Sequence, residues 1–402
     1  MDKKRRQLIY LPLEPLEERY TKQWYDWIPQ EFDNASSWDT THIITGNRLT
    51  NTIQTGTFLD LYSSMYWFYE QLRKLTKYLY DDNKHLYTYS NNNSTQKIIF
   101  IPDIEMWGVE GIRYLINLGK IPNAYLVGFL HAASYTKEDF MEPMAYIGKH
   151  SECAWIEAMD LVFLGSDYHK QKVLEARPSV NPDKLVVTGN PFCTKDVIGP
   201  RGLKPTETRK YDVVISDRPD YEKRVHETML ALLPAVEKHN IKVAITTSRE
   251  VYSSSTGFIG DLAKLLSNKF PNNYYLFEGL SKEEYYDIVS DSKTFVTCTI
   301  EENFGYSFLE ACALGAIPVV PRKFSFNEHL QTRHKWSYDT FDFSYCFYDT
   351  TGDISDKVIG VRESCKDVSG ISWRSLYSAL SKRAEIFDKS VKRMRTRIED
   401  IL

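Results

Sequence analysis

The sequence lacks the features that mark membrane-spanning, secreted and zinc-binding proteins. No apolar run approaches the roughly 20 residues that a membrane-spanning helix needs. The basic cluster at residues 3–6 precedes a short apolar piece and then three glutamates, so we expect no signal peptide. None of the six cysteines forms a Cys-x-x-Cys pair, which argues against a zinc site and favours free thiols in a reducing compartment. We therefore expect a soluble, cytoplasmic protein.

An excess of positive charge is also absent. The chain carries 50 lysines and arginines against 54 aspartates and glutamates, which gives a formal net charge of -4. Proteins hold nucleic-acid phosphates with lysine and arginine, so this balance argues against binding by overall charge and leaves a local basic groove open. No Asp-x-Asp motif lies where a catalytic metal would be expected, and we therefore expect no metal ligands.

The length and the apolar pattern predict two α/β domains. With 402 residues the chain is long for a single domain. Short apolar runs alternate with stretches of helical spacing, which indicates βαβ units and parallel sheets. In the first half the predicted strands are 7–12, 97–102, 125–131, 161–166 and 185–189. The helical stretches between them are 58–79, 108–118 and 141–159.

A segment rich in glycine, proline and threonine, 189–210, is typical of an interdomain linker. The alternation then restarts. Its predicted strands are 211–216, 242–248, 273–279, 294–299 and 318–321, and its predicted helices are 224–239, 258–266, 282–290 and 306–314. We expect Rossmann-like domains over 1–195 and 196–375, with a cleft between them. The charged stretch 373–402 predicts one long amphipathic helix, whose part 376–402 should pack back on the first domain.

The segment Glu302–Pro321, ENFGYSFLEACALGAIPVVP, carries the most specific functional pattern. Ligands of open parallel sheets bind outside the carboxyl ends of the strands, and Gly305 is predicted on a tight turn from a strand into a helix. Without a Cβ, its backbone can come close to a ligand. We expect the backbone amides of Gly305, Tyr306 and Ser307 to be unpaired donors for an anion or a hydroxyl.

Two glutamates flank that turn. Glu302 could accept hydrogen bonds from sugar hydroxyls, and Glu310, one turn into the helix, could bind both hydroxyls of a ribose. The residues alone fit a helix cap or a solvent-exposed helix start equally well.

The segment resembles retaining GT-B glycosyltransferases of the glycogen synthase and sucrose synthase type. The matched positions are Glu302, Phe304, Gly305, Glu310, Ala311, Gly315, Pro318, Val319 and Val320. The resemblance implies two Rossmann-like domains, the second of which binds the donor nucleotide. It implies donor contacts from Glu302, which would also be catalytic, and from Phe304, Gly305, Tyr306, Ser307 and Glu310.

A second match lies in Ser216–Lys223, which resembles the Gly-Arg-Leu-x-x-Glu-Lys segment of the same family. Arg218 and Lys223 are five residues apart, as in that pattern. Two cations near a helix start could clamp a diphosphate and stabilise the departing nucleotide, although a solvated helix start has the same composition. Asp217 replaces the glycine of the family pattern, which puts the local geometry in question.

Weaker matches add further candidates. The backbone near Phe277 and Gly279 would face the nucleobase. His131 ends a predicted strand of the first domain, where the family's histidine would be catalytic near the reacting carbon, and a structural histidine is the alternative. Glu328 lies where the family often has a Gly-Gly-Pro-Glu segment, but the glycines are absent.

The segments 11–29, LPLEPLEERYTKQWYDWIP, and 102–116, PDIEMWGVEGIRYLI, look similar to glycosyltransferases encoded by bacteriophages, some of which modify hydroxymethylated pyrimidines in DNA. This resemblance covers the N-terminal half of the chain. The resemblance implies an acceptor side lined by Asp103, Glu105, Trp107 and Glu110. In the loop after the first strand, Glu14, Arg19 and Tyr20 lie where an acceptor or a donor phosphate could approach. Core packing is the alternative for the aromatic residues.

We therefore expect a hexosyl- or pentosyltransferase that moves sugar from a nucleotide diphosphate sugar, a UDP-sugar by family preference, to a hydroxyl with retention. One acceptor hypothesis is a 5-hydroxymethyl pyrimidine of phage DNA, flipped out of the stack, in the host cytoplasm. Alternatives are a small molecule, a lipid-linked sugar or cell-surface glycan as acceptor, an epimerase of the same fold, and a non-catalytic sugar-nucleotide binder. No permanently bound cofactor is expected.

Overall fold

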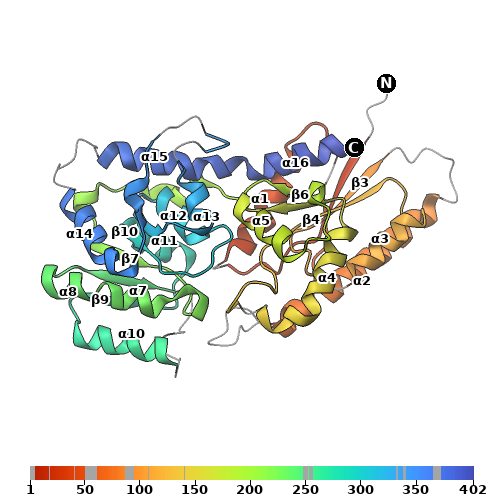
Figure 1. The fold of residues 1–402 in the computed structure, drawn as a ribbon. Coiled ribbons are helices and arrows are strands. Elements are labelled where there is room, and N and C mark those ends of the chain that lie inside the picture. The colour runs from red at the N-terminus through yellow and green to blue at the C-terminus, as the bar shows by residue number, and fades with distance from the viewer. Residues whose placement is uncertain are drawn as a thin grey trace. The chain divides into compact units, whose positions relative to one another are not determined.

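The computed structural model describes most of the chain and divides it into two compact units (Figure 1). The described residues are 5–17, 19–39, 41–49, 61–86, 95–106, 108–139, 141–247, 252, 257–331, 334–337, 341–364 and 373–402. The first unit comprises Met1–Thr136, Phe140–Pro191 and Ser390–Leu402, and the second comprises Lys137–Asp139 and Phe192–Lys389.

The first unit is built on a parallel sheet, which has six strands within the described residues and the order β2-β1-β3-β4-β5-β6. The strands are β1 (Arg6–Tyr10), β2 (Thr41–Ile43), β3 (Gln96–Ile101), β4 (Ala124–Phe129), β5 (Leu161–Leu164) and β6 (Leu185–Val187). The helices are α1 (Tyr20–Asp33), α2 (Leu61–Leu86), α3 (Val109–Asn117), α4 (Ala145–Ala158), α5 (Asp167–Ala176) and α16 (Ser390–Ile401).

The second unit repeats this plan with the order β12-β11-β10-β7-β8-β9, again six parallel strands among the described residues. The strands are β7 (Tyr211–Ile215), β8 (Val243–Thr246), β9 (Tyr274–Phe277), β10 (Ser292–Val296), β11 (Ile317–Pro321) and β12 (Phe347–Tyr348). The helices are α6 (Thr194–Ile198), α7 (Val225–Ala231), α8 (Leu233–His239), α10 (Phe258–Lys269), α11 (Lys282–Ser290), α12 (Tyr306–Ala313), α13 (Phe324–His329), α14 (Ile354–Ser364) and α15 (Trp373–Glu385).

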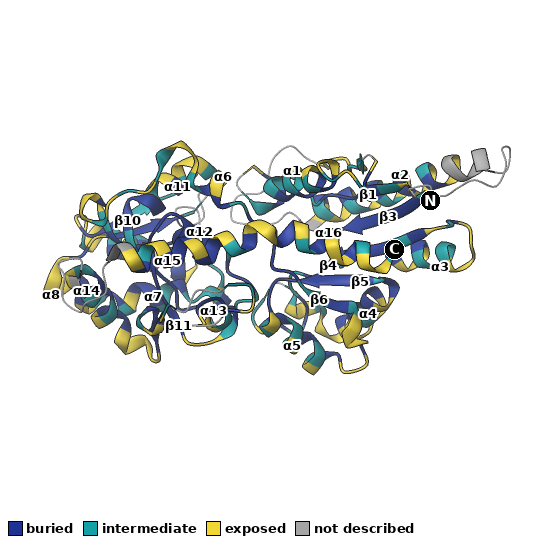
Figure 2. Cartoon of the chain, turned by 90° about the horizontal axis from the view of Figure 1, so that it is seen from above, coloured by how far each residue is buried: buried dark blue, intermediate teal, exposed yellow. Residues whose placement is uncertain are grey.

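Burial explains why the central strands are unbroken apolar runs. Residues 98–101 of β3 and 213–215 of β7 are at most 1% exposed, and Figure 2 shows the strands β3 and β5 in the colour of buried residues. Parallel strands covered on both faces have no polar side to alternate with. The predicted α/β fold with two parallel sheets is therefore confirmed.

Several local predictions were wrong. The loop predicted after the first strand contains α1, and the short strands β2 and β12 were not predicted. The helix predicted over 224–239 is two helices, α7 and α8. They meet at Leu232, just before Pro234, which has no N–H to donate to the preceding turn.

The predicted long C-terminal helix is also interrupted. A 3-10 turn at Ile386–Lys389 separates α15 from α16. The backbone N–H and the hydroxyl of Thr194 both donate to Oδ1 of Asp388 in this turn, at 2.7 and 2.9 Å, and fix it in the second unit. Beyond the turn, α16 packs beside α1 in the first unit, where Trp38 Nε1 donates to Glu399 Oε1 at 2.8 Å (Figure 1).

Candidate functional site

The strand order of the second unit brings the predicted site segments to one edge of the sheet. From β7 the chain adds β8 and β9 on one side and then returns to add β10, β11 and β12 on the other. The order reverses between β7 and β10, which is where open α/β sheets bind ligands at the carboxyl ends of their strands. Arg218 and Lys223 follow β7, and Glu302 and Gly305 follow β10.

Lys223 and Glu302 form the centre of this site. Lys223 Nζ lies 3.0 Å from Glu302 Oε2, and the two side chains are 14% and 18% exposed. Burial by itself raises the pKa of Glu302, but Lys223 and two backbone amides outweigh it and the pKa is lowered. Burial likewise opposes the charge on Lys223, yet Glu302 holds its pKa above the ordinary value. Both groups are therefore charged at neutral pH.

Glu302 also caps the start of α12. Its Oε1 accepts hydrogen bonds from the backbone N–H groups of Phe304, at 3.2 Å, and Gly305, at 2.8 Å. The prediction that the Gly305 amide is unpaired was wrong, because the neighbouring carboxylate reaches it. The predicted tight turn is present: Gly305 has φ +84°, and a Cβ there would lie 3.1 Å from the Phe326 ring.

Arg218 pairs with two carboxyl groups of its own segment. Its guanidinium lies 2.7 Å from Asp220 and 3.1 Å from Glu222, and its side chain is 33% exposed. Glu222 is 4% exposed. Burial raises the pKa of Glu222 to about 7, although Arg218 opposes the shift. The diphosphate clamp proposed from the sequence therefore already has acidic partners within the chain.

Glu310 is buried and surrounded by protein donors. It is 3% exposed and accepts hydrogen bonds from Lys282 Nζ at 2.6 Å, Tyr285 Oη at 3.0 Å and Tyr286 Oη at 3.1 Å. These contacts join α11 to α12. The sequence-based role of Glu310 as a ribose ligand stays a prediction, and the structure adds a role in holding these two helices together.

The remaining predicted donor contacts lie along the same unit. Phe277 ends β9 and is half-buried, whereas Gly279 has φ +68° and open space around the position of a Cβ. Tyr306 and Ser307 begin α12. Glu328 lies in α13, 3.8 Å from Lys335 Nζ.

In the first unit, His131 follows β4 in an aromatic setting. Its ring centroid lies 4.7 Å from Trp24, 4.9 Å from Phe129 and 5.5 Å from Tyr20. Its Nε2 lies 2.8 Å from the carbonyl oxygen of Pro102, so this nitrogen carries the hydrogen. Burial is the main cause that lowers the pKa of His131 to about 4, which keeps the ring neutral at pH 7.

Asp103 lies next to that carbonyl in the sequence. Burial raises the pKa of Asp103 to about 7, against the backbone N–H of Glu105, which donates to its Oδ1 at 3.1 Å. Of the other acceptor-side predictions, Glu110 is exposed in the first turn of α3, and Trp107 lies outside the described residues. In the loop before α1, Glu14 Oε1 lies 3.3 Å from Arg48 Nε, and Arg19 is the cap residue of α1.

Sequence reasoning treated Asp217 only as a departure from a glycine pattern. In the structure Asp217 is 7% exposed among the charged groups of the site. No signal in the sequence predicts this burial, because a single aspartate after a strand is as common on a surface as in a site.

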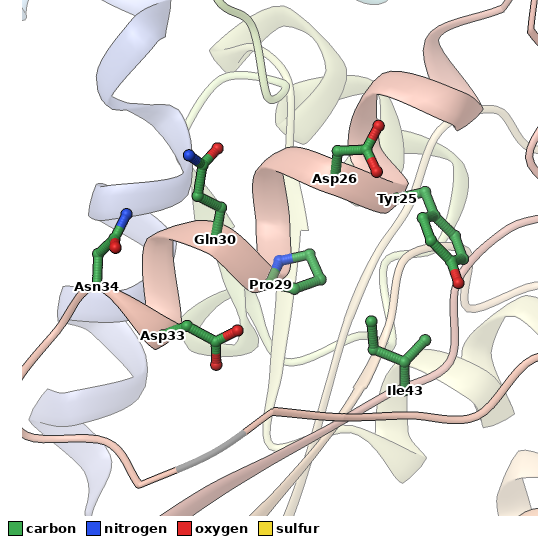
Figure 3. Close-up of a pocket in the computed structure, with 7 residues that line it drawn as sticks. All are labelled: Tyr25, Asp26, Pro29, Gln30, Asp33, Asn34 and Ile43. Atoms are coloured by element: carbon green, nitrogen blue, oxygen red, sulfur yellow. The ribbon is translucent and has the colours of Figure 1, made fainter.

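A surface hollow of about 370 Å³ lies on the first unit (Figure 3). It is lined by α1 and β2 through Tyr25, Asp26, Pro29, Gln30, Asp33, Asn34 and Ile43. None of these was predicted as a site residue.

Across the part of the chain that the structure describes, no three histidine, cysteine, aspartate or glutamate side chains gather in a way that could bind a metal ion. No helix in the same part has both the length and the apolar character to span a bilayer.

Comparison with known proteins gives a clear result for the fold alone. No protein-family model matches the chain, and no curated protein matches it in sequence. Among solved structures, sucrose-phosphate synthase from Thermosynechococcus elongatus is similar with a TM-score of 0.63 and 13% identity, over 99% of this chain and 98% of that one.

Two further structures are similar over almost their whole length. HepE of Anabaena, solved with UDP and glucose, has a TM-score of 0.60 and 11% identity, over 97% of this chain and 99% of that one. An alpha-glucosyltransferase solved with UDP and a 13-mer DNA has a TM-score of 0.56 and 13% identity, over 96% and 95%. The chain therefore has the two-domain α/β fold of the GT-B glycosyltransferases.

Proposed function

We propose that this protein is a glycosyltransferase that moves a sugar from a nucleotide diphosphate sugar to an acceptor hydroxyl. The observation that carries the proposal is the meeting of Arg218, Lys223 and Glu302 at the strand-order reversal of the second sheet. In that position the two cations would stabilise the charge that develops on the departing diphosphate. Glu302, fixed by Lys223 and by the amide of Gly305, would accept hydrogen bonds from the sugar.

The proposed mechanism retains the configuration of the sugar, as the resemblance to the glycogen synthase type implies. The departing phosphate would take the proton of the incoming hydroxyl on the same face of the sugar. His131, neutral at pH 7, stays the proposed catalytic residue of the first unit. UDP is the proposed nucleotide, supported by the resemblance and by similar structures solved with UDP.

The proposed acceptor is a 5-hydroxymethyl pyrimidine in DNA, and the proposed location is the cytoplasm of a phage-infected host. Support comes from the resemblance of the N-terminal half to phage enzymes and from the similar glucosyltransferase solved with DNA. The acidic balance of the chain works against tight DNA binding, and the acceptor is therefore tested separately from sugar transfer. A hydroxyl of a small molecule or a cell-surface glycan is the alternative acceptor.

Two measurements test the proposal in sequence. Incubation with single UDP-sugars, without acceptor, should release UDP slowly by hydrolysis, whereas an epimerase would convert the sugar and release none. Hydroxymethylated DNA is then added with labelled donor and digested to nucleosides. A sugar-bearing nucleoside supports the DNA acceptor. UDP release without any labelled nucleoside rejects DNA and keeps the transferase, and absence of release with every donor rejects the transferase.

A further inference from the structure

Asp217 places an incompletely bonded carboxyl group in the proposed donor site. It lies two residues beyond the end of β7, and its side chain is buried with 7% exposure. Thr297, just beyond β10, lowers the pKa of this carboxyl group against the effect of burial. The second oxygen, Oδ2, is buried without a hydrogen-bond partner among the described residues. Buried polar atoms are rarely left unpaired, and a bound ligand is one common source of the missing partner.

The charges around Asp217 do not favour an anionic ligand as they stand. Lys223 is paired with Glu302, and Arg218 with Asp220 and Glu222. Asp217 adds a further carboxyl group to these two cations and three acids. If all the carboxyl groups were ionised, the cluster would carry more negative than positive charge and would repel a diphosphate.

Protonation of Asp217 removes one of these negative charges and so reduces the repulsion. Burial is the main cause that raises the pKa of Asp217 to about 6, opposed by Lys223 and by the Thr297 hydroxyl and supported by Glu302. A diphosphate close by would add negative charge and raise that pKa further. Among the described residues, seven charged or titratable groups influence the pKa of Asp217 or are influenced by it: Arg218, Lys223, Tyr252, Tyr285, Cys298, Glu302 and Tyr348. The phenols and the thiol in this group all have raised pKa values and stay neutral at pH 7.

We propose that the donor's diphosphate binds together with one proton from solvent, and that the neutral carboxyl group of Asp217 then donates a hydrogen bond from Oδ2 to a phosphate oxygen. The inference rests on the proposed function for the chemistry of the ligand. It gives Asp217 a binding role that the glycine of the family pattern could not fill, because glycine has no side chain to protonate.

The experiment is calorimetric titration of the full chain with intact nucleotide sugars, whose phosphates do not titrate between about pH 6 and about pH 8.5. UDP-glucose, UDP-galactose, UDP-N-acetylglucosamine and GDP-mannose are screened, and the tightest binder is titrated in two buffers of different ionisation enthalpy. We expect net uptake of about half to one proton per ligand near pH 7. Affinity should fall up to about tenfold per pH unit on the alkaline side.

Asp217→Asn is the decisive variant, because an amide keeps the size and an N–H donor but cannot take up a proton. It should bind the donor with an affinity that changes less than about threefold over the same pH range, without the proton uptake of the wild type. Asp217→Ala should bind the nucleotide sugar about tenfold or more weakly at pH 6.5, because the side chain that donates the hydrogen bond to the phosphate is lost. Asp212→Asn is the matched control: Asp212 is a buried aspartate near the other end of β7, bonded to Lys293 at 2.8 Å, and its variant should keep the wild-type uptake.

The outcomes separate the two proposals. If proton uptake persists in Asp217→Asn but disappears in Glu222→Gln, Glu222 is the group that takes up the proton. That result would overturn the inference. Donor binding without proton uptake in the wild type would overturn it as well, while the proposed function stands. If no nucleotide sugar binds at any pH, the proposed function fails and the inference fails with it. Melting temperatures of all variants establish that each is folded.

Discussion

Each unit buries an ion pair, but the two pairs differ in how completely they are hydrogen-bonded. In the first unit Glu152 and Arg177 are 2% and 8% exposed and lie 2.6 Å apart, and both also hydrogen-bond to Ser134. In the second unit Lys223 and Glu302 are more exposed, and Asp217 beside them leaves a buried oxygen unpaired. Closed networks rigidify a fold, whereas incomplete ones mark places where a ligand can supply the missing partner. We therefore expect the first pair to stabilise the fold and the second pair to serve the proposed binding of the donor.

The largest expected effect concerns the first pair. Arg177→Met leaves the carboxylate of Glu152 buried without its cation, which should cost about 3–5 kcal/mol of unfolding free energy. Hydrogen exchange of the β4 and β5 amides in urea measures this loss within the first unit. Lys184→Met is the control: it removes the more exposed pair with Glu157, and should cost less than about 1 kcal/mol. Equal costs for the two variants would show that the buried pair does not hold the first unit together.

The second pair should matter for catalysis instead. Lys223→Met should lower kcat/KM for transfer by about 10²–10³-fold, or about 3–4 kcal/mol, because a cation at the departing diphosphate is lost. Lys204→Met removes another ion pair of the same unit, with Asp291 at 2.6 Å, and should leave the rate within about threefold. If both variants lose the same activity, the effect comes from general damage to the second unit.

A pair of glycines tests how the helix that carries Glu310 is supported. Gly315 follows α12 with φ +78°, and a Cβ there would lie 1.5 Å from the Tyr377 ring. Gly315→Ala should therefore cost about 2–4 kcal/mol through overpacking and backbone strain. Gly119 in the first unit has φ +67° with open space, so Gly119→Ala should cost only the backbone part, about 1–2 kcal/mol. Chemical denaturation measures both, and a smaller loss for Gly315→Ala would contradict the packing argument.

The smallest effect is a difference in pH dependence. Burial, with help from Lys172 and His131, lowers the pKa of His169 in the first unit to about 3. As pH falls, His169 in the unfolded chain, with a pKa near 6.5, takes up a proton before the buried ring of the folded chain does. The free energy of unfolding therefore decreases, by about 1 kcal/mol between about pH 6.5 and about pH 5.5. His169→Gln should remove that part of the slope in urea titrations at the two pH values, and an unchanged slope would count against it.

Asp217 should act in the opposite sense in the second unit. Its pKa is raised in the folded chain, so the unfolded chain loses the proton first as pH rises. The stability that the neutral carboxyl group contributes is full below about pH 4 and is lost as pH rises towards about 6. Asp217→Asn should flatten this alkaline loss, which unfolding titrations of the same variant used for binding would show.

The sequence predicts those parts of the fold in which burial allows only apolar residues. β3 and β7 lie inside their sheets, so their residues are apolar without interruption and are easy to recognise. The short strands β2 and β12 lie at sheet edges and have no such run. α1 was taken for a loop, and it contains Pro29, a residue that argues against a helix in any sequence-based reading.

The candidate site likewise has features that the sequence predicts and features that it does not. That Lys223 and Glu302 each follow a strand of the second domain is predicted from the alternation of strands and helices. The order of the strands, which brings the two residues together, is not predicted by that alternation. The bond from the Gly305 amide to Glu302 depends on the rotamer of one side chain, and the burial of Asp217 depends on what packs over it. Residue spacing encodes neither the hydrogen bond nor the burial, so neither could be predicted from the sequence.

The turn at Ile386–Lys389 has one more consequence. The chain enters the main body of the second unit at Phe192 and leaves it at Lys389, and the bonds from Thr194 to Asp388 hold these two points together. The main body of the second unit is thus a continuous segment with adjoining ends, inserted between two segments of the first unit. Two junctions suffice to exchange such a segment between chains of this fold, and under the proposed function this exchange would transfer donor choice separately from acceptor choice.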